Sequence, residues 1–420
     1  MQKLEVIGGK KLEGEVRISG AKNSSLPILI SSLLTDKPLV LHNIPHLNDV
    51  TSMITLLREL NVDITMQENL SVTAQADNVT SWTAPYDIVR TMRASIMVIA
   101  PCLARFHKAV VSLPGGCLIG SRPIDMHLQG LEAMGAKCVI KEGYIHCTAP
   151  KGLKGATIKF KNKTVTGTEN ILMAATLAKG VTTIKNAACE PEIVDLANCL
   201  ERMGAKIKGQ GTETIRVEGV KKLGGAEYSI MPDRIESGTF LAAAAATKGH
   251  VRIKNTSHKY LKHVITKLKQ TGAQIDCHGD WIELNMKGKR PKAVNIKTAP
   301  YPRFPTDMQA QFMAVNCIAD GNSKVQETVF ENRFMHTDEM KRMGADITIK
   351  NNCAMIKGVK SLSGADVIAS DLRASASLII SALVAEGTSN INRVYHIDRG
   401  YEFIEEKMQK LGAQIVRKID

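Results

Sequence analysis

The sequence predicts an α/β protein built from six copies of one β-α-β-α-β-β unit. The main observation is a helical run that ends in a Gly-Ala pair, or its equivalent, at intervals of roughly 70 residues, too regular for chance. Each copy needs a left-handed residue at the helix end, where glycine is the best residue and asparagine the next best. The capping residues are Asn61, Gly135, Gly204, Gly272, Gly344 and Gly412.

The fourth unit shows the order of elements expected within one repeat. Apolar residues recur every three or four positions in its expected helices, and they alternate or form short runs in its expected strands. A glycine at 249 separates the first helix from the second strand. The predicted strand, helix, strand, helix, strand and strand span residues 226–230, 235–247, 251–254, 261–270, 273–276 and 281–286.

The composition narrows the class of partner. A chain of 420 residues is long enough for two or three domains, and 44% hydrophobic with 23% charged residues is ordinary for a globular protein. Lysine and arginine number 55 against 41 aspartates and glutamates, a formal net charge of +14 that favours anionic partners. The basic residues are spread along the chain and aromatic residues are only 4%, so phosphorylated metabolites are at least as good candidates as nucleic acid.

The nine cysteines indicate neither a disulfide framework nor a zinc site, because their number is odd and no pair has CxxC spacing. We expect inert core thiols in a reducing compartment. The first residues lack the apolar core of a signal peptide, and no apolar run reaches transmembrane length. These observations predict a cytoplasmic protein.

The glycine-rich stretch at 113–125 carries the most unusual residues of the chain. It holds Cys117, Arg122 and Asp125, and Pro123 suits the first turn of a helix. Its glycines allow the backbone to approach a ligand closely, and a helix N-terminus attracts anions. A surface turn with a chance cysteine is the alternative interpretation of this stretch.

Arginines stand at many of the expected helix starts, where Asp, Ser and Asn are the usual residues. Their charge opposes the helix dipole, and a bound anion shared by helix ends and arginines would offset that cost. The alternative is that each arginine pairs with an adjacent carboxylate at the surface, which contributes little. The arginines concerned are Arg90, Arg93, Arg122, Arg234, Arg333, Arg373 and Arg399.

Several long segments resemble the UDP-N-acetylglucosamine 1-carboxyvinyltransferases, the enolpyruvyl transferases that open peptidoglycan synthesis. The likeness covers the whole chain and implies a two-domain inside-out α/β barrel, with helices inside, sheets outside and three units in each domain. It implies domains at 22–231 and at 1–21 plus 232–420, with the active site in the cleft between them. The segments are 21–23, 113–127, 304–311, 331–336, 371–377 and 395–402.

The resemblance also implies a reaction. Phosphoenolpyruvate and UDP-N-acetylglucosamine would give the 3-O-enolpyruvyl ether and phosphate, by addition and elimination through a tetrahedral ketal. It implies a thiol that fosfomycin alkylates and that can carry a covalent adduct of the donor. It further implies a monomer that works on small molecules, with neither nucleic acid nor membrane as a partner and without cofactor or metal.

Matching residues take their roles from this resemblance. Cys117 would protonate the methylene carbon, Asp307 would act as the base at the sugar hydroxyl, and Lys22 and Arg399 would complete the catalytic set. The phosphoenolpyruvate-binding residues would be Lys22, Asn23, Arg122, Arg333, Arg373 and Arg399. The nucleotide-sugar contacts would be Arg93, Arg122, Pro123, Ile124, Asp125, Met126, Lys163, Thr164, Val165, Asp307 and Val329. At 164–168 the glycine is displaced by one position from a common pattern of the family.

Two other functions stay open. The sister enolpyruvyl transferase of the shikimate pathway shares the fold and the donor but lacks the cysteine-bearing loop. A nucleic-acid-binding protein on a repeat scaffold is supported only by the net charge. The histidines near the motifs are expected to make structural hydrogen bonds; they are His127, His336 and His396.

Overall fold

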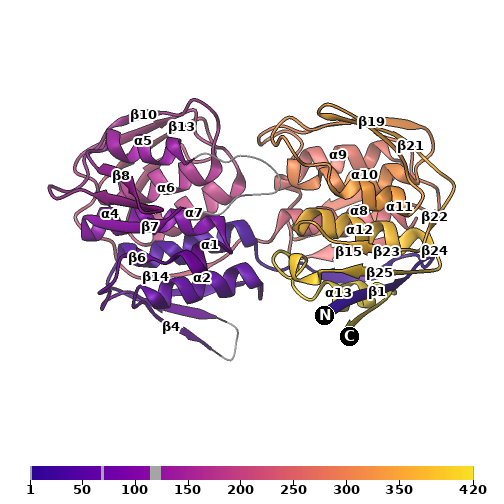
Figure 1. Ribbon diagram of the computed structural model, residues 1–420, viewed down its shortest axis with the longest axis horizontal. Coiled ribbons are helices and arrows are strands. Elements are labelled where there is room, and N and C mark those ends of the chain that lie inside the picture. Colours follow the sequence, from indigo (N-terminus) through magenta and orange to yellow (C-terminus); the bar gives the residue numbers. More distant parts are fainter. Residues whose placement is uncertain (1, 68–70, 114–123, 420) are drawn as a thin grey trace. The chain divides into compact units, whose positions relative to one another are not determined.

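The computed structural model describes residues 2–67, 71–113 and 124–419, which divide into two compact units (Figure 1). The α1 unit contains the described residues of 20–113 and 124–231. The α8 unit contains the described residues of 2–19 and 232–419. Each unit has its own hydrophobic core.

Three buried helices pack against one another at the centre of the α8 unit, with strands on the outside (Figure 1). Every residue of the first two is buried, so these helices lie inside the core and present no face to solvent. The three helices are α8 (Arg234–Ala246), α10 (Gln309–Cys317) and α12 (Leu372–Val384). Shorter helices follow them in the repeat: α9 (Lys262–Gln270), α11 (His336–Arg342) and α13 (Ile404–Lys410), with 3-10 turns η3 (His258–Tyr260), η4 (Thr306–Met308) and η5 (Val394–His396).

Three four-stranded sheets cover these helices in the described part of the α8 unit. In each sheet the first pair of strands is parallel and the other pairs are antiparallel. A parallel two-stranded sheet joins β22 (Leu362–Ser363) and β24 (Ala385–Glu386). In spatial order the three sheets are β2 (Glu13–Arg17), β15 (His250–Lys254), β17 (Trp281–Asn285), β16 (Gln274–His278); β18 (Ile296–Lys297), β19 (Asn322–Gln326), β21 (Cys353–Lys357), β20 (Asp346–Lys350); and β23 (Asp366–Ile368), β25 (Thr388–Asn392), β1 (Gln2–Ile7), β26 (Gln414–Ile419).

The α1 unit repeats this design. Its inner helices are α1 (Lys22–Ser31), α4 (Ile99–Phe106) and α6 (Val165–Thr176). They are accompanied by α2 (Asn48–Glu59), α3 (Tyr86–Val89), α5 (Asp125–Ala133), α7 (Pro191–Arg202), η1 (Ser32–Leu34) and η2 (Arg93–Val98). The sheets are β14 (Ala226–Ser229), β3 (Leu39–His42), β5 (Val72–Gln75), β4 (Asp63–Met66); β6 (Thr83–Ala84), β7 (Lys108–Ser112), β9 (Tyr144–Thr148), β8 (Lys137–Lys141); and β10 (Thr157–Lys159), β11 (Val181–Lys185), β13 (Thr214–Glu218), β12 (Lys206–Lys208).

The helix caps confirm the predicted repeat. The five capping glycines have φ between 88° and 103°, and the asparagine in the first copy has φ of 63°. In five of the six copies the next residue donates its backbone N–H to a carbonyl five residues earlier, as Ala136 does to Leu131. This six-fold pattern of helices and sheets is the predicted α/β fold class.

One predicted strand lies in a different sheet from the one expected. The strand at 226–230 was expected to open the fourth unit, but β14 pairs in parallel with β3 in the α1 unit. Its place beside β15 is taken by β2 from the start of the chain, and β1 completes the last sheet beside β25 and β26. Alternation of apolar residues identifies a strand but not its partner, because parallel neighbours come from distant parts of the chain.

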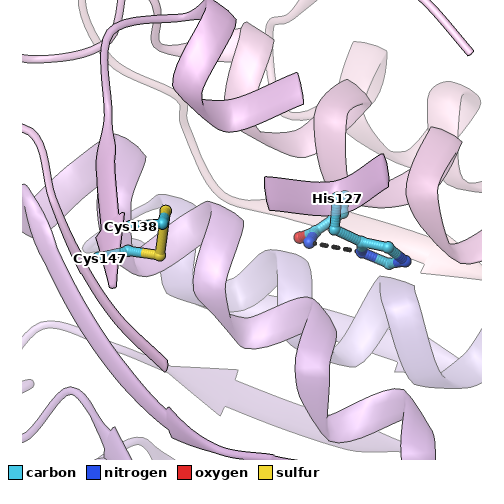
Figure 2. Close-up of a disulfide and its surroundings, with 4 residues drawn as sticks. His127, Cys138 and Cys147 are labelled. Carbon is cyan, nitrogen blue, oxygen red and sulfur yellow. Dashed lines mark hydrogen bonds between the residues drawn. A yellow bond between two sulfur atoms is a disulfide. The ribbon is translucent and has the colours of Figure 1, made fainter. Parts of the chain in front are cut away.

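The cysteine prediction is wrong at one hairpin. Cys138 in β8 and Cys147 in β9 stand directly opposite each other in the antiparallel pair, with Cα atoms 4.2 Å apart, and form a disulfide (Figure 2). Cross-strand neighbours follow no CxxC spacing, so cysteine spacing alone does not reveal this pair. Among the free thiols, burial raises the pKa of Cys102, Cys199 and Cys317 to about 12, which confirms inert core thiols there.

Over the ranges described above, we find no helix whose length and apolar character would let it cross a bilayer.

Candidate active site

Two buried arginines, Arg234 and Arg373, stand at the starts of α8 and α12. Asp233 caps α8 and accepts hydrogen bonds from the N–H groups of the second and third residues that follow it. Asp371 caps α12 in the same way. A capped first turn holds its residues in place, so Arg234 and Arg373 project from fixed backbone at the two helix starts.

A carboxylate lies between two of the predicted arginines. Asp307 Oδ1 accepts a hydrogen bond from Arg333 Nη2 at 2.7 Å, and Oδ2 lies 3.1 Å from Arg373 Nη2. The arginine side chains are 6% and 3% exposed, whereas that of Asp307 is 26% exposed. The alternative of surface pairs between adjacent residues is therefore wrong for Arg333 and Arg373, which share a partner far away in the sequence.

The electrostatics of this cluster favour a further anion. Although burial alone would raise it, the neighbouring Arg373, Arg333 and Arg234 hold the pKa of Asp307 well below its usual range. Three guanidinium groups thus surround one carboxylate that stays ionised at neutral pH. Nη1 of Arg373 is buried and has no hydrogen-bond partner among the described residues. Buried donors of this kind bind carboxylates and phosphates strongly.

Two other predicted residues of the α8 unit lie outside this contact. Val329 is exposed after β19, and its N–H donates to Glu327 Oε1 at 2.7 Å. Arg399 is half-buried in the segment between η5 and α13. Together with burial, Arg399 lowers the pKa of His396.

In the α1 unit, the predicted Lys22 is the first residue of α1 and is buried. Its Nζ lies 2.7 Å from Asp49 Oδ2 in the first turn of α2. Asn23 follows in the same turn and is half-buried. Asp49 was not among the predicted residues, because it lies in an ordinary amphipathic helix and carries no motif.

A buried histidine joins the next predicted residues. His127 Nδ1 accepts from Asn170 Nδ2 at 3.0 Å, the bond drawn as a dashed line at His127 in Figure 2. Nε2 lies 3.2 Å from Thr166 Oγ1. Burial lowers the pKa of His127 to about 4; Asp125 opposes this shift and Arg93 adds to it. The predicted Arg93 and Asp125 are therefore electrostatic neighbours of one neutral imidazole, which makes the structural hydrogen bonds that the sequence suggested.

The remaining predicted contacts in this unit occupy two helix starts. Thr164 caps α6, and its Oγ1 accepts from Gly167 N at 3.2 Å. Lys163 pairs with Glu213 at 2.6 Å, away from the His127 hydrogen bonds. The other residues at these starts are Ile124, the N-cap of α5, Asp125 and Met126 in its first turn, and Val165, the first residue of α6.

The predicted Cys117, Arg122 and Pro123 lie outside the described residues. The structure adds a buried acid that was not predicted, Glu169, whose pKa is raised well above its usual value by burial and by Glu192 and Glu190. A glutamate inside an apolar helix gives little sequence signal. In the described ranges no group of three His, Cys, Asp or Glu side chains could hold a metal ion.

The histidine makes a prediction about pH. Because the pKa of His127 is lowered from 6.5 to about 4 on folding, the unfolded chain binds more protons between these values. Its contribution to stability is full above pH 6.5 and is lost as the pH falls toward 4, about 3 kcal/mol in all. His127→Gln should therefore lose less stability than wild type between pH 7 and pH 4 in urea unfolding. The exposed-site variant His250→Gln should follow wild type, and parallel curves for all three proteins would contradict the prediction.

A family model and two solved structures match all or nearly all of the chain. The family model described as EPSP synthase (3-phosphoshikimate 1-carboxyvinyltransferase) matches residues 6–408. The crystal structure of the enolpyruvyl transferase NikO from Streptomyces tendae is similar, with a TM-score of 0.88 and 23% identity over 99% of each chain. The EPSP synthase from Acinetobacter baumannii, in a 2.37 Å structure, has a TM-score of 0.78 and 18% identity over 100% of each chain. At these identities the two structures establish the fold.

Proposed function

Since the chain belongs to the EPSP synthase (3-phosphoshikimate 1-carboxyvinyltransferase) family, whose members are enolpyruvyl transferases, we propose that it transfers the enolpyruvyl group of phosphoenolpyruvate to the 3-hydroxyl of UDP-N-acetylglucosamine. The acceptor rests on one observation: the segment 113–127, with Cys117 and Arg122, matches the cysteine-bearing loop of the transferases that use this sugar nucleotide. The reaction would be the first committed step of peptidoglycan synthesis, a cytoplasmic process required for cell shape and division.

The proposed reaction has two balanced steps. In the addition, the sugar oxygen bonds to C2 of phosphoenolpyruvate, Cys117 gives a proton to C3, and Asp307 takes the hydroxyl proton. In the elimination, the Cys117 thiolate takes a proton back from C3, the electrons of that C–H bond form the C2–C3 double bond as the bond from C2 to the phosphate oxygen breaks, and phosphate departs with the proton held by Asp307. Lys22, Arg122 and Arg399 would balance the charge of the donor, as cations do for phosphoryl groups.

The arginine cluster supports the part assigned to Asp307. As long as Arg333 and Arg373 hold its carboxylate, the low pKa makes Asp307 a weak base. An anionic substrate competes for the same guanidinium groups, so its arrival would raise the pKa of Asp307 and make proton removal easier. The base would then work only when the substrate is in place.

The test is a phosphate-release assay with phosphoenolpyruvate and UDP-N-acetylglucosamine, run with and without fosfomycin. We expect release that needs both substrates and that fosfomycin abolishes. Release without the sugar nucleotide, or none at all with it, would overturn the proposed acceptor.

Shikimate 3-phosphate is the second candidate acceptor, because the matching family model carries the name of that reaction. The same assay separates the two. Phosphate release with shikimate 3-phosphate and none with the sugar nucleotide would favour EPSP synthase activity. Salt-dependent binding to duplex DNA without any phosphate release would favour the nucleic-acid alternative.

Replacing Cys117 by alanine should reduce turnover by about 10³-fold, because a general acid contributes roughly 10² to 10⁴ to a rate. Phosphate release under saturating substrates measures this loss, and circular dichroism checks the fold. Cys353→Ala in β21 is the matched control and should keep wild-type turnover. In wild type, peptide mass spectrometry should find fosfomycin on Cys117, and undiminished activity of Cys117→Ala would remove the thiol from the mechanism.

A further inference from the structure

A buried carboxylate, that of Glu327, contacts the residue that precedes Asp307. Glu327 follows β19 and is 2% exposed. Its Oε1 accepts from Thr298 Oγ1 at 2.8 Å and from the N–H groups of Val329 and Phe330 at 2.7 and 3.2 Å. Its Oε2 accepts from Thr306 Oγ1 at 2.8 Å. Because four donors satisfy this buried charge, the groups that donate to it are held in place.

The contact with Thr306 fixes a direction in the hydrogen-bond chain. A threonine hydroxyl has one proton, and here that proton is donated to Glu327. The oxygen of Thr306 is therefore left as an acceptor, and Arg333 Nη1 donates to it at 2.7 Å. Nη2 of the same guanidinium donates to Asp307 Oδ1 at 2.7 Å. Arg333 thus holds two consecutive residues, and Glu327 decides how the first of them is oriented.

The same carboxylate also organises the loop that leads to Arg333. Two of its four donors are the backbone N–H groups of Val329 and Phe330. The ring of Phe330 lies under the guanidinium of Arg333, with the Cζ atom 5.1 Å from its centroid. Glu327 therefore positions Arg333 in two ways. It orients the Thr306 hydroxyl that accepts a hydrogen bond from Arg333, and it holds the loop that leads to Arg333.

We propose that Glu327 is a positioning residue for enolpyruvyl transfer, which through Thr306 fixes Arg333 and with it the carboxylate of Asp307. It touches no substrate in this proposal and acts only through its neighbours. The inference rests on the proposed function for the reaction that it serves, and on the described contacts for the geometry.

Several charged groups face this chain of contacts. Arg373, Arg333 and Arg234 act on Asp307, and the charges of Asp371 and Arg333 act on His336. If Thr306 loses its hydroxyl, Arg333 loses the acceptor that holds its guanidinium in place. Of the three arginines, it is then the only one whose hold on Asp307 is directly weakened. The carboxylate then binds a proton more readily, so the acid limb of the pH profile of kcat, which reports the enzyme with its substrate bound, should move to higher pH.

The experiment compares two isosteric variants that each remove one hydroxyl donor from Glu327. Thr306→Val should lower kcat about tenfold or more with a small change in KM, since it breaks a hydrogen bond to a charged group on each side. It should also shift the acid limb upward. Thr298→Val removes a donor from Oε1, which does not contact Thr306, and should stay within about threefold of wild type with an unshifted profile. Thr306→Ser restores the hydroxyl and should restore both readouts.

Glu327→Gln tests the carboxylate itself and should lower kcat at least as much as Thr306→Val, because an amide group replaces an acceptor oxygen. A readout without turnover is the rate at which phenylglyoxal modifies Arg333, followed by peptide mass spectrometry; Thr306→Val should raise it and Thr298→Val should not. Equal behaviour of the two valine variants in both readouts would overturn the inference. A wild-type enzyme that releases no phosphate with either acceptor would instead refute the proposed function, and the labelling comparison would still decide the positioning role.

Discussion

Replacing Asp307 by asparagine is expected to lower the free energy of unfolding by about 3 kcal/mol and to abolish most of the turnover. Removing one partner of a buried ion pair leaves the other charge without compensation, at a cost of roughly 3–5 kcal/mol. The lower figure applies here because the Asp307 side chain is 26% exposed. Urea unfolding at pH 7.5 measures the loss. We expect it to fall mainly on the α8 unit, where Arg333 and Arg373 stay buried.

Inorganic phosphate should restore part of this stability, because an anion that binds only the folded protein stabilises it by mass action. In Asp307→Asn the freed guanidinium groups should bind phosphate more tightly than in wild type. Asp338→Asn is the control: that side chain is 82% exposed and its pair with Lys341 should contribute less than about 1 kcal/mol. A variant as stable as wild type, or one indifferent to phosphate, would contradict the ionic account of the cluster.

Replacing Lys407 by methionine should lower the free energy of unfolding by about 3 kcal/mol at pH 8 and by less at pH 5. Lys407 Nζ lies 2.6 Å from Glu236 Oε1, and the two side chains are 12% and 3% exposed. Burial raises the pKa of Glu236 even with the lysine present. Without the lysine the pKa rises further, so the acid is protonated at low pH and its charge becomes costly as the pH increases. Urea unfolding at the two pH values measures the difference.

Two further variants test whether the loss comes from the buried charge. The double variant Glu236→Gln with Lys407→Met should recover much of the stability at pH 8, since the buried side chain at 236 no longer carries an uncompensated charge. Lys418→Met removes a lysine that is 48% exposed and pairs with Glu5 at 2.7 Å, and it should cost less than about 1 kcal/mol at either pH. The burial argument fails if Lys407→Met loses the same amount at both pH values.

The repeat could be predicted from the sequence because its signal is local. A left-handed residue at a helix end is visible at one position, and six such positions at a regular interval define the units. The helix of the fourth unit, predicted at 235–247, spans Arg234–Ala246. The partner of a strand is a long-range property, however, and β14 has the same sequence pattern in either sheet. The disulfide between Cys138 and Cys147 was not predicted either, because it also depends on which strands pair.

The candidate site divides in the same way. The arginines at helix starts stood out because they break a local preference, and Arg333 and Arg373 do meet an anionic partner. That the partner is Asp307 depends on how α10 and α12 pack, which no local rule specifies. Glu327 and Thr306 belong to no unusual motif, and only the hydrogen bonds of the folded chain reveal them.

The pairing of strands that lie far apart in the sequence sets the order in which the two units can fold. Strand β1 pairs residue by residue with β26, so Gln2 lies opposite Ile419. Strand β1 is therefore synthesised long before its partner β26, while the α1 unit can close its sheets as soon as β14 has emerged. Contacts between such distant residues form slowly, so the α8 unit should be the later of the two units to fold.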